Sequence, residues 1–153
     1  MRRELVISKI ERGTVIDHIN AGKALLVLKI LNIGVGSRDT VTLAMNVSSK
    51  KMGRKDIVKV ANKFIGEEEL NRIALIAPKA TINLIENYEV KRKFKVRLPE
   101  FIEGILRCPN PNCITNSREH VNPKFHVTIR DDVVTARCHY CGRVIRNVDE
   151  FVV

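Results

Sequence analysis

The sequence CPNPNC at residues 108–113 is separated by 24 residues from CHYC at residues 138–141. These two short segments hold every cysteine of the 153-residue chain, namely Cys108, Cys113, Cys138 and Cys141. Two cysteine pairs at this spacing are typical of a structural Zn²⁺ site, in which four thiolates surround the ion tetrahedrally. The sequence therefore predicts one structural zinc ion per chain, with no open coordination position for catalysis.

The segment between the two cysteine pairs has the pattern of a β-hairpin. Apolar residues alternate in FHVTI (125–129) and return in VVTA (133–136), on either side of Asp131-Asp132. We therefore predict a small all-β zinc-ribbon domain of the rubredoxin-like type over residues 104–153. So short a segment supplies little apolar core, and we expect the metal to stabilise its fold.

Residues 1–97 alternate between strand-like and helix-like patterns. The order β, α, β, β, α, β predicts an α+β domain in which two helices cover one face of an antiparallel sheet, the ferredoxin-like arrangement. Asn20 is the expected N-cap of the first helix. The segment 98–103, which begins Leu-Pro-Glu, is the predicted linker to the second domain. The expected strands are 5–10, 14–19, 41–47, 56–60 and 81–90, and the expected helices are 21–31 and 67–77.

The excess of positive charge lies in the first domain. The chain has 27 Lys and Arg against 17 Asp and Glu, and residues 1–97 hold 20 basic and 10 acidic side chains. Such a surplus indicates either solvated faces or a polyanionic partner. Nucleic acid is the weaker choice of partner, because aromatic residues are 5% of the chain and Trp is absent. A nucleotide needs cations, a carboxylate for ribose and amide groups for the base, which Asp17, His18, Lys59, Asn83, Tyr88 and Lys93 would supply if their strands are neighbours.

Sequence features of enzymes, secretion and membrane insertion are missing. The chain has no glycine-rich phosphate loop, no GxSxG and no HExxH. Asp17 and His18 are adjacent, so strand alternation predicts that they point to opposite faces and form no catalytic pair. No apolar run is long enough to span a bilayer or to serve as a signal peptide. We therefore expect a non-catalytic, soluble and cytoplasmic protein whose cysteines are reduced.

Several segments in sequence order resemble the regulatory chain of aspartate carbamoyltransferase. They are RGTVIDHI (12–19), MGRKDIVK (52–59), APKATIN (77–83), IENYEV (85–90), LPE (98–100) and the two cysteine motifs. The resemblance implies a non-catalytic chain that forms homodimers through an N-terminal nucleotide-binding domain. It further implies a zinc domain that docks on catalytic chains, so that three regulatory dimers join two catalytic trimers. In this family CTP, often with UTP, lowers activity and ATP raises it, which controls pyrimidine biosynthesis.

The resemblance also implies roles for individual residues. Asp17 and Lys59 are expected to contact the ribose and base, and His18 and Lys93 the phosphates. Lys55 is expected near the phosphates, and Asn110 and Asn112 against the catalytic chain. The base pocket is expected to be formed by Asn83, Ile85, Tyr88 and Val90, with backbone contacts from Ile10.

Other functions stay open at this point. The extreme N-terminus departs from the enterobacterial form of the family at Arg3-Glu4 and at Ser8-Lys9. A zinc-ribbon nucleic-acid binder and a nucleotide sensor without a catalytic partner are the two alternatives.

Overall fold

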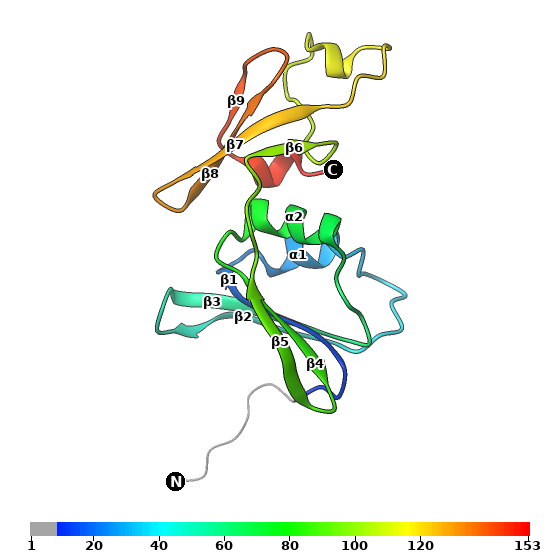
Figure 1. The fold of residues 1–153 in the computed structure, drawn as a ribbon, viewed down its shortest axis with the longest axis vertical. Helices are drawn as coiled ribbons and strands as arrows, with labels where there is room; N and C mark the ends of the chain where they lie inside the picture. The colour runs from blue at the N-terminus through cyan, green and yellow to red at the C-terminus, as the bar shows by residue number, and fades with distance from the viewer. Residues whose placement is uncertain (1–8) are drawn as a thin grey trace.

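The computed structural model describes residues 9–153, which form two domains, each built on an antiparallel sheet (Figure 1). The first sheet has the strand order β2-β3-β1-β4-β5, and the second has the order β6-β7-β8-β9. The order β2-β3-β1-β4 with two helices is the predicted ferredoxin-like arrangement, to which β5 adds a fifth strand. The elements of the first domain are β1 (Gly13–Asn20), α1 (Ala24–Ile30), β2 (Val41–Ser49), β3 (Gly53–Ala61), α2 (Glu67–Ile76), β4 (Thr81–Glu86) and β5 (Glu89–Lys95).

The second domain is all-β apart from two short 3₁₀ turns. It contains the predicted hairpin, which turns at Asp131 and Asp132, both with positive φ. Its elements are β6 (Phe101–Glu103), η1 (Ile114–Asn116), β7 (Lys124–Arg130), β8 (Val133–Cys138), β9 (Val144–Ile145) and η2 (Val148–Phe151). This small sheet with its four cysteines confirms the zinc-ribbon fold class.

Both helices pack on the same face of the five-stranded sheet. Ile16, Val58 and Ile82 from three adjacent strands are fully buried in one core with Val27 of α1 and Ile73 of α2. Figure 1 shows α1 and α2 between this sheet and the second domain. The opposite face of the sheet is therefore covered by neither helix and points away from the second domain. Within residues 9–153, neither helix has the length and hydropathy needed to cross a membrane.

The expected single strand over residues 81–90 is wrong, because the chain reverses direction within it. Asn87 and Tyr88 have φ values of 52° and 65° and form a two-residue turn between β4 and β5. A turn of this kind needs positive φ at both central residues and is usually marked by Asn-Gly, a signal that Asn-Tyr does not carry. The charged segment that follows is thus an exposed edge strand, where charged side chains are well tolerated.

The first helix begins three residues later than expected, and Asn20 does not cap it. A residue from β3 binds this end of the helix instead: Asp56 Oδ2 accepts hydrogen bonds from the backbone N–H of Gly22, just before the helix, and from that of Ala24, its first residue, at 2.9 and 3.0 Å. Gly22 has a φ of 90°, which keeps this residue outside the helix. The cap of α1 is therefore a tertiary contact, which local sequence patterns cannot show.

The two domains meet through a short connection and a shared apolar contact. Residues 101–103, expected to lie in the linker, form β6 and pair with β7. Leu75 of α2 is buried in the core of the second domain, and Leu98 and Val152 pack against both cores. The expected strand at 5–10 falls largely outside the described residues, and Lys9 and Ile10 belong to no strand.

Candidate ligand face and metal centre

Residues from four strands form one row across the helix-free face of the first sheet. The register places Lys59 of β3 opposite Val15 of β1, Val15 opposite Asn83 of β4, and Asn83 opposite Lys93 of β5. Directly paired residues share a face of a sheet. Lys59, Asn83 and Lys93, which are far apart in the sequence, are thus brought together on one face.

A β-bulge places Asp17 and His18 on this same face. Ile16 pairs with Val58 and Ile19 with Asp56, so that Asp17 and His18 together lie opposite a single residue of β3. Ile16 and Ile19 both point into the core under the helices. His18 has a φ of 55°, which turns its side chain out of the normal alternation. The expectation that Asp17 and His18 point to opposite faces is therefore wrong.

Asp17 and His18 are held by specific contacts. Lys55 Nζ lies 2.8 Å from Asp17 Oδ1, and the backbone N–H of His18 donates to the same oxygen at 2.6 Å. The ring of His18 reaches across to β4, where its Nδ1 lies 3.1 Å from Oγ1 of Thr81. Thr81 pairs with Asp17 and is buried, so these contacts fix the bulge against the neighbouring strand.

The pKa values of this group reflect partial burial among lysines. Burial by itself raises the pKa of Asp17, but the hydrogen bonds from Lys55 and from His18 N–H outweigh it and hold the pKa below 3.8. Burial lowers the pKa of His18 below 6.5; Asp17 opposes this, whereas the charges of Lys55, Lys51 and Lys93 add to it. Burial also lowers the pKa of Lys59, again against the effect of Asp17. The face thus presents a neutral imidazole at pH 7 amid several cations and one carboxylate.

A cavity of about 270 Å³ adjoins His18 at this end of the sheet. Its polar lining includes Thr81 and the cationic side chains of Lys51, Lys79 and Lys95. Three ammonium groups around a partly polar cavity suit a polyanionic group such as phosphate.

The other end of the face is apolar. Ile85 pairs with Gly13 of β1 and with Val90 of β5, one row beyond Asn83. Tyr88 lies at the exposed tip of the β4–β5 turn, where its backbone N–H donates to the carbonyl of Glu11 at 3.0 Å. Ile10 lies next to Glu11, at the start of the described chain. An apolar region beside a row of polar groups suits a flat heterocycle.

The four cysteines converge on one point of the second domain. Their sulfur atoms all lie within 4.8 Å of one another, with Cys108 Sγ 3.6 Å from Cys141 Sγ and Cys113 Sγ 3.7 Å from Cys138 Sγ. Four sulfurs at about 2.3 Å from a central ion would be about 3.8 Å apart in a regular tetrahedron. This donor set fits a closed, four-coordinate structural metal centre.

Hydrogen bonds order the loops that carry these cysteines. Asn116 Nδ2 donates to the carbonyls of Cys108 and Asn110 at 2.9 and 2.6 Å. The side chain of Asn110 accepts the N–H of Asn112 at 3.0 Å, whereas the side chain of Asn112 is exposed. Of the two predicted interface residues, Asn110 thus shapes the loop and Asn112 faces outward.

Three features of these sites were not assigned from the sequence. Thr81 was missed, although it is two residues before Asn83 and so shares its face of the strand. Lys79, in the turn before β4, was not counted with the basic residues near the site. Asp56 was missed because nothing in GRKDIVK shows that this one acidic residue points inward.

Both domains match known protein families. The family model for the allosteric domain of the aspartate carbamoyltransferase regulatory chain matches residues 5–97, and the model for the metal-binding domain of the same chain matches residues 100–150. The chain is 64% identical over 151 residues to the aspartate carbamoyltransferase regulatory chain of Archaeoglobus fulgidus, covering 98% of this chain and 99% of that one. It is 59% identical over 143 residues to the same protein of Pyrococcus horikoshii, covering 93% of each chain.

Proposed function

The chain belongs to the family of aspartate carbamoyltransferase regulatory chains, and from this premise we propose that it binds CTP, UTP or ATP on the helix-free face of its first sheet. It is a regulatory chain with an allosteric domain and a metal-binding domain, and it is not the catalytic subunit. Its partner is accordingly the catalytic chain of aspartate carbamoyltransferase, whose activity the bound nucleotide adjusts to control pyrimidine biosynthesis.

The observation that carries the nucleotide proposal is the convergence of complementary groups on one face. Lys59, Asn83 and Lys93 lie in one cross-strand row, and the bulge adds Asp17 and His18. Asp17 suits ribose hydroxyls because a carboxylate accepts their hydrogen bonds, and Lys59 lies close enough to Asp17 for their charges to interact.

Phosphates and base are assigned to opposite ends of this face. His18 and Lys93 bind the phosphates, with Lys55 beside them through its ion pair to Asp17. The base lies at the apolar end, against Asn83, Ile85, Tyr88 and Val90, with the backbone of Ile10 close to its edge. The cavity beside His18 supports this orientation, since its three lysines would attract the distal phosphates.

We assign the metal as zinc, one structural ion per chain. The all-thiolate donor set and the sulfur separations favour Zn²⁺, which binds Cys₄ sites in closed tetrahedral geometry. When bound, the ion would crosslink the two cysteine loops and stabilise residues 104–153, without a role in catalysis.

The assembly is proposed to follow from the two domains. The metal domain docks on the catalytic chain through Asn110 and Asn112, and the nucleotide domain, residues 1–97, forms the regulatory homodimer. Edge strand β2 supports the homodimer, since Leu43 and Met45 are 37% and 39% exposed on it. Three such dimers would link two catalytic trimers in the cytoplasm, with no membrane and no nucleic acid as partner.

Calorimetric titration of the zinc-loaded chain with CTP, UTP and ATP tests the proposal. Saturable binding is expected, and it should weaken in Lys93→Ala. Lys29→Ala is the matched control, because Lys29 is an exposed lysine of α1 on the helical side of the sheet. If no nucleotide binds to the chain or to its complex with catalytic chains, the proposal is wrong, and steeply salt-dependent binding of DNA or RNA would favour the nucleic-acid alternative.

A further inference from the structure

The proposed nucleotide face and the metal domain lie on opposite sides of the helical layer. Both helices lie between the five-stranded sheet and the second domain (Figure 1). One route from the nucleotide to the metal domain crosses the sheet and then passes the helices. The described residues contain a chain of polar contacts that makes this crossing.

The first step of this route is Asp56, which crosses the sheet. Its neighbour Lys55 pairs with Asp17 on the nucleotide face. Because successive residues of a strand point to opposite faces, Asp56 points toward the helices, and it is fully buried there. The side chain of Lys55 on one face and the buried carboxylate of Asp56 on the other are thus joined by one peptide bond of β3.

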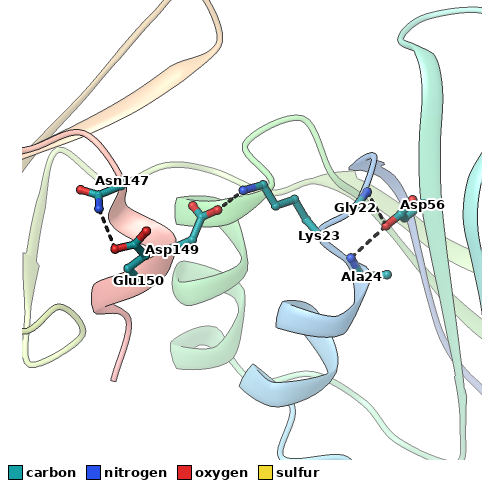
Figure 2. A network of polar contacts seen from close by, with 7 residues as sticks. All are labelled: Gly22, Lys23, Ala24, Asp56, Asn147, Asp149 and Glu150. Atoms are coloured by element: carbon teal, nitrogen blue, oxygen red, sulfur yellow. Dashed lines mark hydrogen bonds and ion pairs between the residues drawn. The ribbon is translucent and has the colours of Figure 1, made fainter.

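Asp56 in turn holds the beginning of α1. Its Oδ2 accepts the N–H groups of Gly22 and Ala24 at 2.9 and 3.0 Å (Figure 2). Its Oδ1 accepts the N–H of Asn46 at 2.8 Å. Hydrogen bonds from backbone N–H groups to a buried carboxylate are strong, and they leave it little freedom to move independently. The start of α1 therefore follows the position of β3.

The second step is the ion pair between Lys23 and Asp149. Lys23 lies between the two residues whose N–H groups Asp56 binds, and its Nζ contacts Oδ2 of Asp149 in η2 of the metal domain (Figure 2). The side chains of Lys23 and Asp149 are 36% and 25% exposed, so the pair is only partly screened by water. It joins the start of α1 to the C-terminal turn of the other domain.

We propose that Asp56, Lys23 and Asp149 are positioning residues that couple nucleotide binding to the orientation of the metal domain. The inference rests on the proposed function, since it names the route by which that same nucleotide site regulates the catalytic chain. Coupling of this kind requires an element that both sites bias. Here it is the start of α1, held by Asp56 on one side and by Asp149 on the other.

A second ion pair between the domains provides a comparison. Lys79 Nζ lies 2.9 Å from Asp132 Oδ2 in the β7–β8 turn, but these side chains are 46% and 61% exposed. None of the contacts of Asp56 involves this pair. Lys79 also lines the cavity beside His18, so Asp132→Asn would disturb the proposed phosphate site and cannot serve as the control. Glu69→Gln is the matched control, because it removes the ion pair between Glu69 and Lys63, which lies within the first domain. The side chains of this pair are about as exposed as those of Lys23 and Asp149.

The test uses the regulatory chain assembled with its catalytic chain. Asp149→Asn and Lys23→Met should leave assembly and the stoichiometry of nucleotide binding unchanged. They should bring the ratio of carbamoyltransferase activities with and without saturating nucleotide about two- to fivefold closer to unity, whether the nucleotide inhibits or activates. The double variant Lys23→Asp with Asp149→Lys should restore most of the wild-type response, whereas Glu69→Gln should keep the wild-type ratio.

The step through Asp56 has its own measurement, because a variant of this buried residue is expected to unfold. In the wild-type chain, nucleotide should change the hydrogen-exchange rates of the Gly22, Ala24 and Asn46 amides. Unchanged rates at these amides, or a full response in Asp149→Asn, would overturn the inference and leave the proposed function standing. If no nucleotide binds, or if the wild-type assembly responds to none, the proposed function fails and the inference fails with it.

Discussion

The imidazole Nδ1 of His18 lies 3.1 Å from Oγ1 of Thr81, a residue that pairs with Asp17 on the face of the sheet away from the helices. This contact exists because a bulge places two consecutive residues of β1 on one face. A carboxylate and an imidazole thereby become neighbours among several lysines. The arrangement suits the ribose and phosphates of a nucleotide, and it leads to the following predictions.

Lys93→Ala should weaken the binding of nucleoside triphosphates more than that of nucleosides. A charge-assisted contact to phosphate is worth about 1.5 to 3 kcal/mol, so CTP or ATP should lose roughly 10- to 150-fold in affinity while cytidine loses little. Calorimetric titration with each ligand measures the difference. Equal losses for CTP and cytidine would place Lys93 away from the phosphates, and Lys29→Ala should bind both ligands like the wild type.

His18 should make triphosphate binding dependent on pH. Burial and the nearby lysines lower the pKa of His18 below 6.5, so the free chain holds it neutral near pH 7. Bound phosphates would favour the imidazolium and raise this pKa, so binding takes up a proton and the affinity should rise as the pH falls from about 8 to about 6. Calorimetric titrations over this pH range should show that the affinity of His18→Gln changes less steeply with pH than that of the wild type. Identical slopes would exclude His18 from the phosphate site.

Asp17 should stabilise the fold at neutral pH and lose this effect in acid. Although burial opposes it, the Lys55 contact holds the pKa of Asp17 below its ordinary value of 3.8. The ionised form is thus favoured by folding, and its contribution is present above about pH 4 and lost as the pH falls through the lowered pKa. Asp17→Asn should be less stable than wild type at pH 7 by up to about 1 kcal/mol, since the pair is partly exposed. Urea unfolding at several pH values measures this difference, which should shrink below pH 4; a constant difference would contradict the assignment.

Removal of the metal should unfold the second domain and leave the first intact. Three of the four cysteines are buried within the core of the second domain, and zinc modules of this kind gain about 10 to 16 kcal/mol of folding free energy from the ion. After treatment with a strong chelator, hydrogen exchange should become fast in β7 and β8 and stay slow in β1 and β3. The metal-free chain should still bind nucleotide but no longer join the catalytic chain. Slow exchange in β7 and β8 without metal would contradict a structural role for the ion.

Substitutions at Asn112 and Asn116 should affect different properties, namely docking on the catalytic chain and stability of the metal domain. Asn116 Nδ2 bonds two carbonyls of the first cysteine loop, so Asn116→Ala should lower the stability of the metal domain by about 1 kcal/mol. Asn112 has an exposed side chain, so Asn112→Ala should leave stability unchanged and weaken assembly with the catalytic chain. Thermal unfolding and sedimentation of the mixed chains measure the two effects. Wild-type assembly of Asn112→Ala would remove this residue from the interface.

The amino-acid sequence by itself determined the two domains' fold classes, the pairing of four cysteines into one cluster and the family. The fold classes and the cysteine cluster follow from local patterns, namely alternating apolar residues, helix-like segments and cysteine pairs at short spacing. The family follows from the resemblance of specific motifs such as RGTVIDHI (12–19). The β7–β8 hairpin at Asp131 and Asp132 is such a case, because its turn chemistry and its apolar alternation agree.

Only the tertiary structure decided where the functional groups lie. The row from Lys59 to Lys93 depends on strand order and register. Asp17 and His18 share a face because of a bulge in β1. The start of α1 is held by Asp56, which is 32 residues from Ala24 in sequence. Each of these is a contact between segments distant in the chain. Their energies come from packing and hydrogen bonds that exist only once the sheet has formed, so no local pattern records them.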